Sequence, residues 1–364
     1  MPRADALYFD NNATAPLRPE AASAMQSAMG PPSNPSSVHG YGRAARQIVE
    51  TARAEIALLA GSRPADVVFT SGGTEANNLA LSGFDHVITS AIEHDSVLRA
   101  APDAVLIGVD TDGRLDLDAL RDILATVDPS ARDKTILSVM MANNETGVIQ
   151  PVDDVVTLAK QAGVAVHCDM VQMLGKSHLD FAASGFDYAS LSAHKIGGPT
   201  GVGALLVRPG RAMTSLLRGG GQEQGRRSGT ENFLGIAGFG AAAKAAFDDV
   251  AHYRAMAEWR DAFEARVAAV RNDAVIYGSG AERLANTSCL AVGSKSSETM
   301  VMAMDLAGVA ISAGSACSSG KVHESHVLKA MKAGEGAARA IRISGGWQTT
   351  KVDFEKLAEV LTAL

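Results

Sequence analysis

The chain has little cysteine, and it has no apolar run long enough to cross a membrane. Its three cysteines, Cys168, Cys289 and Cys317, are widely spaced and form no CxxC pair. An odd number of scattered cysteines argues against a disulfide framework and against a zinc site, so we expect reduced thiols and no bound metal. Because the N-terminal residues also lack the apolar core of a signal peptide, we expect a cytoplasmic protein with no membrane association.

An excess of positive charge is absent as well. Lys and Arg number 33 against 40 Asp and Glu, which gives a formal net charge of −7 at pH 7. Such a chain has no field that would attract nucleic acid or an anionic membrane, so we expect neither as a partner. The hydrophobic content of 46% with 20% charged residues is typical of a well-packed protein. With 364 residues, one large and one smaller domain are expected.

Strand-like and helical stretches alternate through the first two thirds of the chain. The sequence predicts strands at the starts of two stretches, YFDNNAT and VVFTSGG, and then at residues 86–90, 104–109, 135–142, 164–169, 186–192 and 201–207. Helical periodicity lies between several of them, at 40–60, near 116–127 and at 151–162. This alternation favours an α/β fold with a mostly parallel sheet covered by helices.

The last third of the chain has a different pattern. Long helical patterns cover about 232–271, and shorter mixed elements follow, among them an apolar helix at 298–308. We therefore predict a smaller α+β domain in this part. The expected large domain is 12–248, and the expected small domain combines 1–11 with 249–364.

Polar residues stand where several predicted strands end, in places where a core needs none. The stretch SLSAHKIGGPTG, residues 190–201, puts a serine, a histidine and Lys195 at the end of a buried strand, and other strands lead to His94, Asn144 and Asp169. Open α/β sheets bind ligands at the carboxyl ends of their strands, so these groups are expected to converge. Taken singly, Asp169 also suits a helix N-cap and His94 a surface imidazole.

The stretch VVFTSGGTEANNLAL, residues 67–81, predicts an anion cradle. Its strand, Ser-Gly-Gly-Thr turn and helix place the N–H groups of a helix start beside two hydroxyls. It lacks the lysine of a P-loop and the spacing of GxGxxG, so it suits a single phosphate better than a pyrophosphate, with a plain helix cap as the alternative. An amine, a carboxylate, an imidazole and a phosphate cradle on one sheet edge suit pyridoxal phosphate.

The sequence resembles the cysteine desulfurases of nitrogen fixation and iron–sulfur cluster assembly, which are fold-type I pyridoxal phosphate enzymes of the class-V aminotransferase family. The resemblance extends over nearly the whole chain and is carried, in the family's order, by YFDNNAT, TSGGTEANN, AIEHDSV, MANNETG, HCDMVQ, SAHKIGGPTG, GRRSGTEN, SAGSACSSG and IRISGG. It implies a seven-stranded, mostly parallel sheet, a homodimer, and an enzyme that converts L-cysteine to L-alanine and leaves the sulfur on a cysteine as a persulfide.

The resemblance also implies residue roles. Lys195 would bind pyridoxal 5'-phosphate covalently, Cys317 would receive the sulfur, and His94 would stack on the ring and act as acid–base for the substrate thiol. The other implied contacts are Asp169 to the ring nitrogen, Gln172 to the phenolic oxygen, Gly73, Thr74, Ser192 and His194 to the phosphate, Thr230 to the phosphate of a partner subunit, and Asn144 and Arg342 to the substrate carboxylate.

Cys317 separates the desulfurase from other enzymes of this fold. Its neighbours in SAGSACSSG are small, whereas Cys168 and Cys289 suit buried structural positions. The polar stretch after Cys317 resembles that of family members that pass the persulfide to an external acceptor, so a sulfur-acceptor or scaffold protein is an expected partner. The alternatives are a selenocysteine lyase, an aminotransferase, a nicotinamide-dependent oxidoreductase and a catalytically silent scaffold subunit; the last two leave Lys195 without a purpose.

Overall fold

A seven-stranded sheet forms the centre of the protein, whose computed structural model describes residues 6–30, 32, 34–314 and 324–364. In the described residues its spatial order is β2-β8-β7-β6-β5-β3-β4. The strands are β2 (Val67–Thr70), β3 (His86–Ser90), β4 (Val105–Ile107), β5 (Thr135–Met140), β6 (Ala165–Asp169), β7 (Tyr188–Ser192) and β8 (Gly203–Val207). Only β8 runs antiparallel to its neighbours within this sheet, so the predicted mostly parallel sheet is confirmed.

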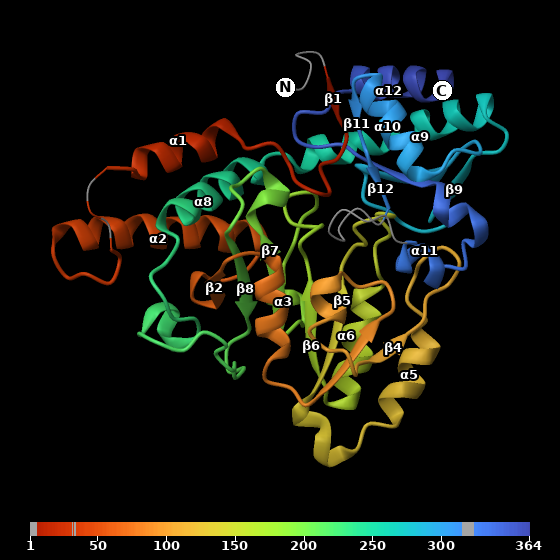
Figure 1. The fold of residues 1–364 in the computed structure, drawn as a ribbon. Coiled ribbons are helices and arrows are strands. Elements are labelled where there is room, and N and C mark those ends of the chain that lie inside the picture. Colours follow the sequence, from red (N-terminus) through yellow and green to blue (C-terminus); the bar gives the residue numbers. More distant parts are fainter. Residues whose placement is uncertain (1–5, 31, 33, 315–323) are drawn as a thin grey trace.

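Helices bury this sheet. Every residue of β5, β6, β7 and β8 is buried, as expected of strands covered on both faces. Helix α3 packs on β7 and β8, and α1 and α2 each pack on α8, which lies between them (Figure 1). The helices of this part are α1 (Pro19–Ala28), α2 (Gly40–Ala60), α3 (Gly73–Leu81), α4 (Asp95–Leu98), α5 (Leu117–Ala125), α6 (Val152–Ala162), α7 (Phe181–Ser184) and α8 (Phe233–Phe247).

A second, antiparallel sheet lies above the first in Figure 1, in the order β12-β13-β10-β9. Its strands are β9 (Val275–Tyr277), β10 (Thr287–Ala291), β12 (Ser312–Ala313) and β13 (Ala340–Ser344), and nearby β1 (Leu7–Tyr8) pairs with β11 (Val309–Ala310). The helices of this part are α9 (Val250–Val270), α10 (Ser297–Leu306), α11 (His326–Ala330) and α12 (Lys351–Ala363). The helical pattern predicted over 232–271 is therefore two helices, α8 and α9, and the domain boundaries stay a prediction.

The strand register brings the polar strand ends to one edge. Asp169 of β6 pairs with Met140 of β5 on one side and with Ser190 of β7 on the other. On the far side of β7, Ser192 pairs with Gly203, which in turn pairs with Thr70 immediately before the turn into α3. The ends of β5, β6 and β7 and the start of α3 therefore surround one region of the molecule.

Candidate active site

A cavity of about 270 Å³ lies at this edge of the sheet. Its walls come from the ends of β5, β6 and β7, from the start of α3 and from the N-terminal segment around Asn12. Among the lining residues are Gly73, Thr74, His94, Asn144, Asp169, Gln172, Ser192, His194 and Lys195. Every cofactor-binding residue predicted from the sequence except Thr230 therefore lines one cavity.

Lys195 lies directly after the end of β7, the buried strand predicted at 186–192. Directly after β7 the chain forms a short 3-10 helix, η3 (Ala193–Ile196), which ends at Gly197 with a φ of +80°. A Cβ at Gly197 would lie 2.6 Å from Cγ of Arg18, so the turn requires glycine. The Lys195 ammonium donates to the backbone oxygens of Asn12 at 2.5 Å and Ala13 at 2.8 Å, which hold the amine at the cavity wall.

A hydrogen-bonded network joins the predicted carboxylate to the predicted imidazole. Asp169 accepts from the backbone N–H of Val171 at 2.9 Å and from the side-chain amide of Asn77 at 2.7 Å. The same amide donates to the Ser96 hydroxyl at 2.8 Å, which lies 2.8 Å from Nδ1 of His94. Since the Ser96 backbone N–H also donates to Nδ1 at 3.1 Å, a neutral His94 ring carries its proton on Nε2.

Asn77 and Ser96 are functional candidates that the sequence analysis did not single out. Both are buried, and both line the cavity. Asn77 lies in the TSGGTEANN motif, on the face of α3 that turns toward β6. Its position in a helix that begins at the predicted phosphate cradle is the sequence feature from which its role could have been predicted. Its Oδ1 is buried and has no hydrogen-bond partner among the described residues, which leaves an acceptor beside the Asp169 carboxylate.

The start of α3 has the features of a phosphate cradle. The residue before it, Gly72, has a φ of +155°, a conformation that favours glycine. A Cβ at Gly73 would lie 3.0 Å from Val171 and 3.5 Å from the Ser192 side chain, so the missing side chain keeps the cradle open. The first N–H groups of a helix have no acceptor within it, and here they stand beside the cavity-lining Thr74 and Ser192. A phosphate fits these groups.

His194 completes this wall of the cavity as a neutral ring. Its Nδ1 lies 3.1 Å from the hydroxyl of Thr14. Burial, and after it the positive charge of Lys195, lower the pKa of His194 to about 4. At neutral pH the ring therefore interacts through hydrogen bonds rather than through a charge.

The remaining predicted residues lie elsewhere. Arg342, in the centre of β13, is completely buried and is absent from the lining of the cavity; its guanidinium donates to Asp10 at 2.7 Å and to the backbone oxygen of Asn144 at 3.2 Å. Thr230 is exposed and lines a different hollow, beside Ser71. Cys317 lies outside the described residues.

The other two cysteines are confirmed as core residues. Cys168 and Cys289 are free thiols with no exposed surface. Burial raises the pKa of the Cys168 thiol, as do the charges of Asp169 and Glu93, and burial likewise raises the pKa of Cys289. Both thiols stay protonated at neutral pH, so neither is suited to act as a nucleophile.

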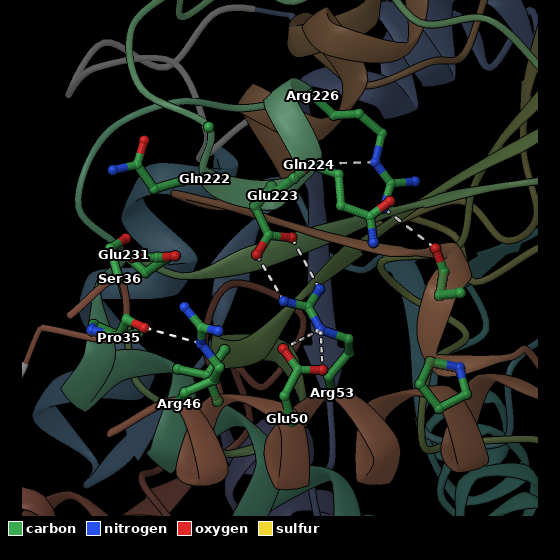
Figure 2. Close-up of a pocket in the computed structure, with 14 residues that line it drawn as sticks. Pro35, Ser36, Arg46, Glu50, Arg53, Gln222, Glu223, Gln224, Arg226 and Glu231 are labelled. Atoms are coloured by element: carbon green, nitrogen blue, oxygen red, sulfur yellow. Dashed lines mark hydrogen bonds and ion pairs between the residues drawn. The ribbon is translucent and has the colours of Figure 1, made fainter. Parts of the chain in front are cut away.

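A larger cavity, of about 480 Å³, lies away from this site, between α2 and the short helix η4 (Gln222–Gly225) (Figure 2). Most of its charged groups are paired within the protein, although Oε2 of Glu231 is buried without a hydrogen-bond partner among the described residues. Arg53 donates to both carboxylate oxygens of Glu223, at 2.9 and 2.7 Å, and Glu223 also accepts from the backbone N–H of Phe69 at 2.9 Å. Arg46 donates to the backbone oxygen of Pro35 at 3.0 Å. Such pairing is typical of structural ion pairs.

Two further properties hold for the described residues. No group of three or more His, Cys, Asp or Glu side chains is arranged to hold a metal ion there. In the same part of the chain, every helix is too short or too polar to cross a membrane.

Comparison with known proteins identifies the family. The aminotransferase class-V model matches residues 7–357. A cysteine desulfurase of Cereibacter sphaeroides is 40% identical over 98% of this chain and 94% of its own length, and the cysteine desulfurase IscS of Dictyoglomus turgidum is 37% identical over 98% and 93%. The crystal structure of a NifS-like protein from Rickettsia africae superposes with a TM-score of 0.90 at 34% identity, covering 98% of this chain and 99% of that one.

Proposed function

This chain belongs to the class-V aminotransferase family, and from that premise we propose that it is a pyridoxal phosphate-dependent cysteine desulfurase. It would convert L-cysteine to L-alanine and leave the sulfur on Cys317 as a persulfide, for iron–sulfur cluster assembly or another pathway that needs sulfur. The observation that carries the proposal is the cavity at the strand ends, where Lys195, Asp169 and His94 stand around one space.

Pyridoxal 5'-phosphate fits the residues of this cavity. Lys195 would hold it covalently, Asp169 would hold the ring nitrogen, and the start of α3 with Ser192 would hold the phosphate. The orphan acceptor of Asn77 and the open cradle at Gly73 both support this fit. When bound, the cofactor supplies a ring that accepts the electron pair left on the substrate's α-carbon after a proton is removed.

The protein's own groups move the protons. The Lys195 amine, at the cavity wall, takes the proton from the α-carbon and returns a proton to the product. His94 acts on the proton of the substrate thiol. Ser96 fixes the ring through Nδ1, so Nε2, on the opposite side of the ring, is the atom that would exchange this proton. Asp169 would balance the positive ring nitrogen, with Val171 and Asn77 donating to its oxygens.

The sulfur transfer is assigned to Cys317 on the sequence alone. Its thiolate attacks the sulfur of the substrate, so that an S–S bond forms while the C–S bond breaks. The electron pair of the broken bond stays with the carbon that becomes the methyl group of alanine. A free thiol with a pKa of about 8.5 is mostly protonated at neutral pH, so a base must take the proton from Cys317.

The substrate's carboxylate is assigned to Asn144 and Arg342. Asn144 lines the cavity, and its backbone oxygen accepts from Arg342, which links the guanidinium to the site. Arg342 is bound to Asp10, and its Nε has no hydrogen-bond partner among the described residues. A planar guanidinium with an unused N–H can donate to a second carboxylate without giving up its first partner.

Three finer assignments belong to this proposal. The chain would form a homodimer, in which Thr230, exposed and absent from the lining of the cofactor cavity, would contact the phosphate of the partner subunit. A sulfur-acceptor or scaffold protein would take the persulfide. The cytoplasm, where thiols stay reduced, suits the unpaired Cys168 and Cys289.

The test is to incubate the purified protein with L-cysteine and a reductant and to measure alanine and sulfide. Cys317→Ser is expected to keep the visible absorbance of the bound cofactor but to form no sulfide, whereas Lys195→Ala loses both. Lys160→Ala, at an exposed lysine of α6, is the matched control and is expected to behave as wild type. Undiminished sulfide release in Cys317→Ser would refute the persulfide route. Alanine formed from selenocysteine but not from cysteine would assign a lyase instead.

A further inference from the structure

A second lysine, Lys176, is buried beside the proposed site. Only 7% of its surface is exposed, and the structure records no ion pair for it within the residues that it describes. Its ammonium donates instead to two amide oxygens, Oδ1 of Asn12 and Oε1 of Gln172, each at 3.0 Å. Burying an amine without a carboxylate is unfavourable, so a lysine in this position calls for an explanation beyond packing.

The chain directs Lys176 toward the cofactor cavity. After β6 it forms turns in which the N–H groups of Met173 and Leu174 bond back to Met170, so that Gln172 and Lys176, four residues apart, lie on the same side. Between them, Gly175 has a φ of +71°, and a Cβ there would lie 3.1 Å from both Ile196 and Ala246. Close packing against the segment that follows Lys195 therefore fixes the direction of the Lys176 side chain.

Lys176 and the backbone oxygen of Asn12 together set which way the Gln172 amide faces. Nε2 of Gln172 donates to the backbone oxygen of Asn12 at 3.0 Å, and a carbonyl can only accept. Oε1 accepts from the amine of Lys176, which donates to it whether charged or neutral. Both ends of the amide thus agree on one orientation, and the second N–H of Nε2 remains to donate to a cofactor oxygen.

We propose that Lys176 is a positioning residue for the cofactor, because it holds the Gln172 amide with its nitrogen toward the ring oxygen. This inference rests on the proposed pyridoxal phosphate site. Without the Lys176 donor, only the backbone oxygen of Asn12 still favours this orientation, so the flipped amide, with its nitrogen and oxygen exchanged, costs less free energy and is populated more. The ring oxygen, an acceptor, would then face the amide oxygen for part of the time.

The same lysine also contacts Asn12, whose side chain other residues hold in place and whose backbone binds Lys195. The side chain of Asn12 accepts from Lys176 and from Asn286 at 3.2 Å, and it donates to Thr287 of β10 at 2.9 Å, while its backbone oxygen accepts from Lys195. Burial, and after it the charges of Lys195 and Arg342, lower the pKa of Lys176 well below its usual value. The two amines therefore share Asn12 and lie close enough to interact electrostatically.

The test uses Lys176→Met, which keeps the length of the side chain and removes its donors. Pyridoxal phosphate is titrated into the apoprotein, and the dissociation constant and the visible absorption maximum are measured. We expect about a tenfold weaker affinity, the size of one lost charge-assisted hydrogen bond, and a shifted absorption maximum. Lys176→Gln, which keeps an N–H donor, should lie between Lys176→Met and wild type and serves if Lys176→Met does not fold. Lys160→Met is the matched control and should not differ from wild type.

A double-mutant cycle with Gln172→Ala separates positioning from general stability. If Lys176 acts through Gln172, adding Lys176→Met to Gln172→Ala should change the affinity by less than about twofold. Two outcomes would overturn the inference. One is that the effects of the two substitutions on the dissociation constant multiply, and the other is an absorption spectrum of Lys176→Met identical to that of wild type. A wild-type protein that binds no pyridoxal phosphate would instead refute the proposed function, and the inference with it.

Discussion

Two cavities of this protein, the one at the strand ends and the one in Figure 2, differ in how their polar groups are used, and we assign the chemistry to the smaller one. The cavity of Figure 2 is larger, about 480 Å³ against about 270 Å³, and three arginines and three glutamates line it. Its best-buried pair, Arg53 and Glu223, is bidentate, with side-chain exposures of 11% and 3%. The cavity at the strand ends instead holds an amine, a carboxylate and two imidazoles that come from three segments of the chain, since His194 and Lys195 are adjacent in η3.

The difference teaches that volume and charge do not identify a site by themselves. Around Glu223 the charges cancel within the protein and join α2, β2 and η4, which is a structural task. Around Asp169 the donors come from a helix and a turn, and the carboxylate faces an open space. A group positioned by its neighbours but still facing a cavity is available to a ligand.

The largest expected effect contrasts these two carboxylates. Asp169→Asn keeps the shape of the side chain but removes the charge that would balance the ring nitrogen, so alanine formation should fall by on the order of 10² to 10⁴-fold. Glu223→Gln should retain activity within a few-fold but remove the buried charged partner of Arg53, which keeps only the exposed Glu50, at a cost of about 3 kcal/mol in the free energy of unfolding. Turnover and denaturant unfolding of both variants are the measurements. Equal losses of activity would remove the distinction between the cavities.

A second prediction contrasts the ion-paired Glu223 with another buried carboxyl, Glu93, for which the described residues include no ion-pair partner. It accepts from the Ser90 hydroxyl at 2.5 Å and from the Met140 N–H at 2.8 Å, and burial raises its pKa to about 8, with a further increase from Asp169. Since folding raises the pKa of Glu93, the contribution of its protonated carboxyl to the free energy of unfolding is complete below pH 4.5, the ordinary pKa of a glutamate. This contribution is lost as the pH rises to about 8.

Glu93→Gln should remove much of this pH dependence. Between pH 5 and 8, wild type is expected to lose on the order of 3 kcal/mol of unfolding free energy that Glu93→Gln keeps. A slope should remain, because burial also raises the pKa of Glu145 to about 7. Denaturant unfolding of the apoprotein across this range checks the prediction, and identical slopes for the two proteins would contradict it.

The smallest effect tests the link between Asp169 and His94. Asn77→Ala removes one amide that donates to both Asp169 and Ser96, so activity should fall by about tenfold, the size of one charge-assisted hydrogen bond. Its neighbour Asn78 donates only to backbone oxygens, at 2.8 and 3.1 Å, and Asn78→Ala is the matched control. Steady-state rates that fall equally in both variants would show that the network is not specific.

Much of the architecture could be predicted because the local signals were strong. The helix predicted at 40–60 is α2, and the strand predicted at 86–90 is β3 with the same bounds. The convergence of Asp169 and Lys195 followed from one rule, that parallel strands end at the same edge. Helix α1 was not predicted from the sequence.

The features that could not be predicted from the sequence depend on contacts between segments that are far apart in the chain. Arg342 is paired with Asp10, more than three hundred residues earlier, through the alignment of β13 beside the N-terminal segment. Lys176 was not singled out from the sequence, since it is the packing of Gly175 against Ile196 that turns it inward. Pairings of this kind follow from the assembled fold and leave no periodicity in the chain.

The most direct test of the account is to find which lysine forms the covalent bond with the cofactor. The protein is loaded with pyridoxal phosphate and reduced with borohydride, and its peptides are mapped by mass spectrometry. Lys195, at the end of β7 and facing the cavity, should carry the reduced cofactor, and the peptide with Lys176 should be unmodified. A label on Lys176, or no label on Lys195, would contradict the assignment of the site.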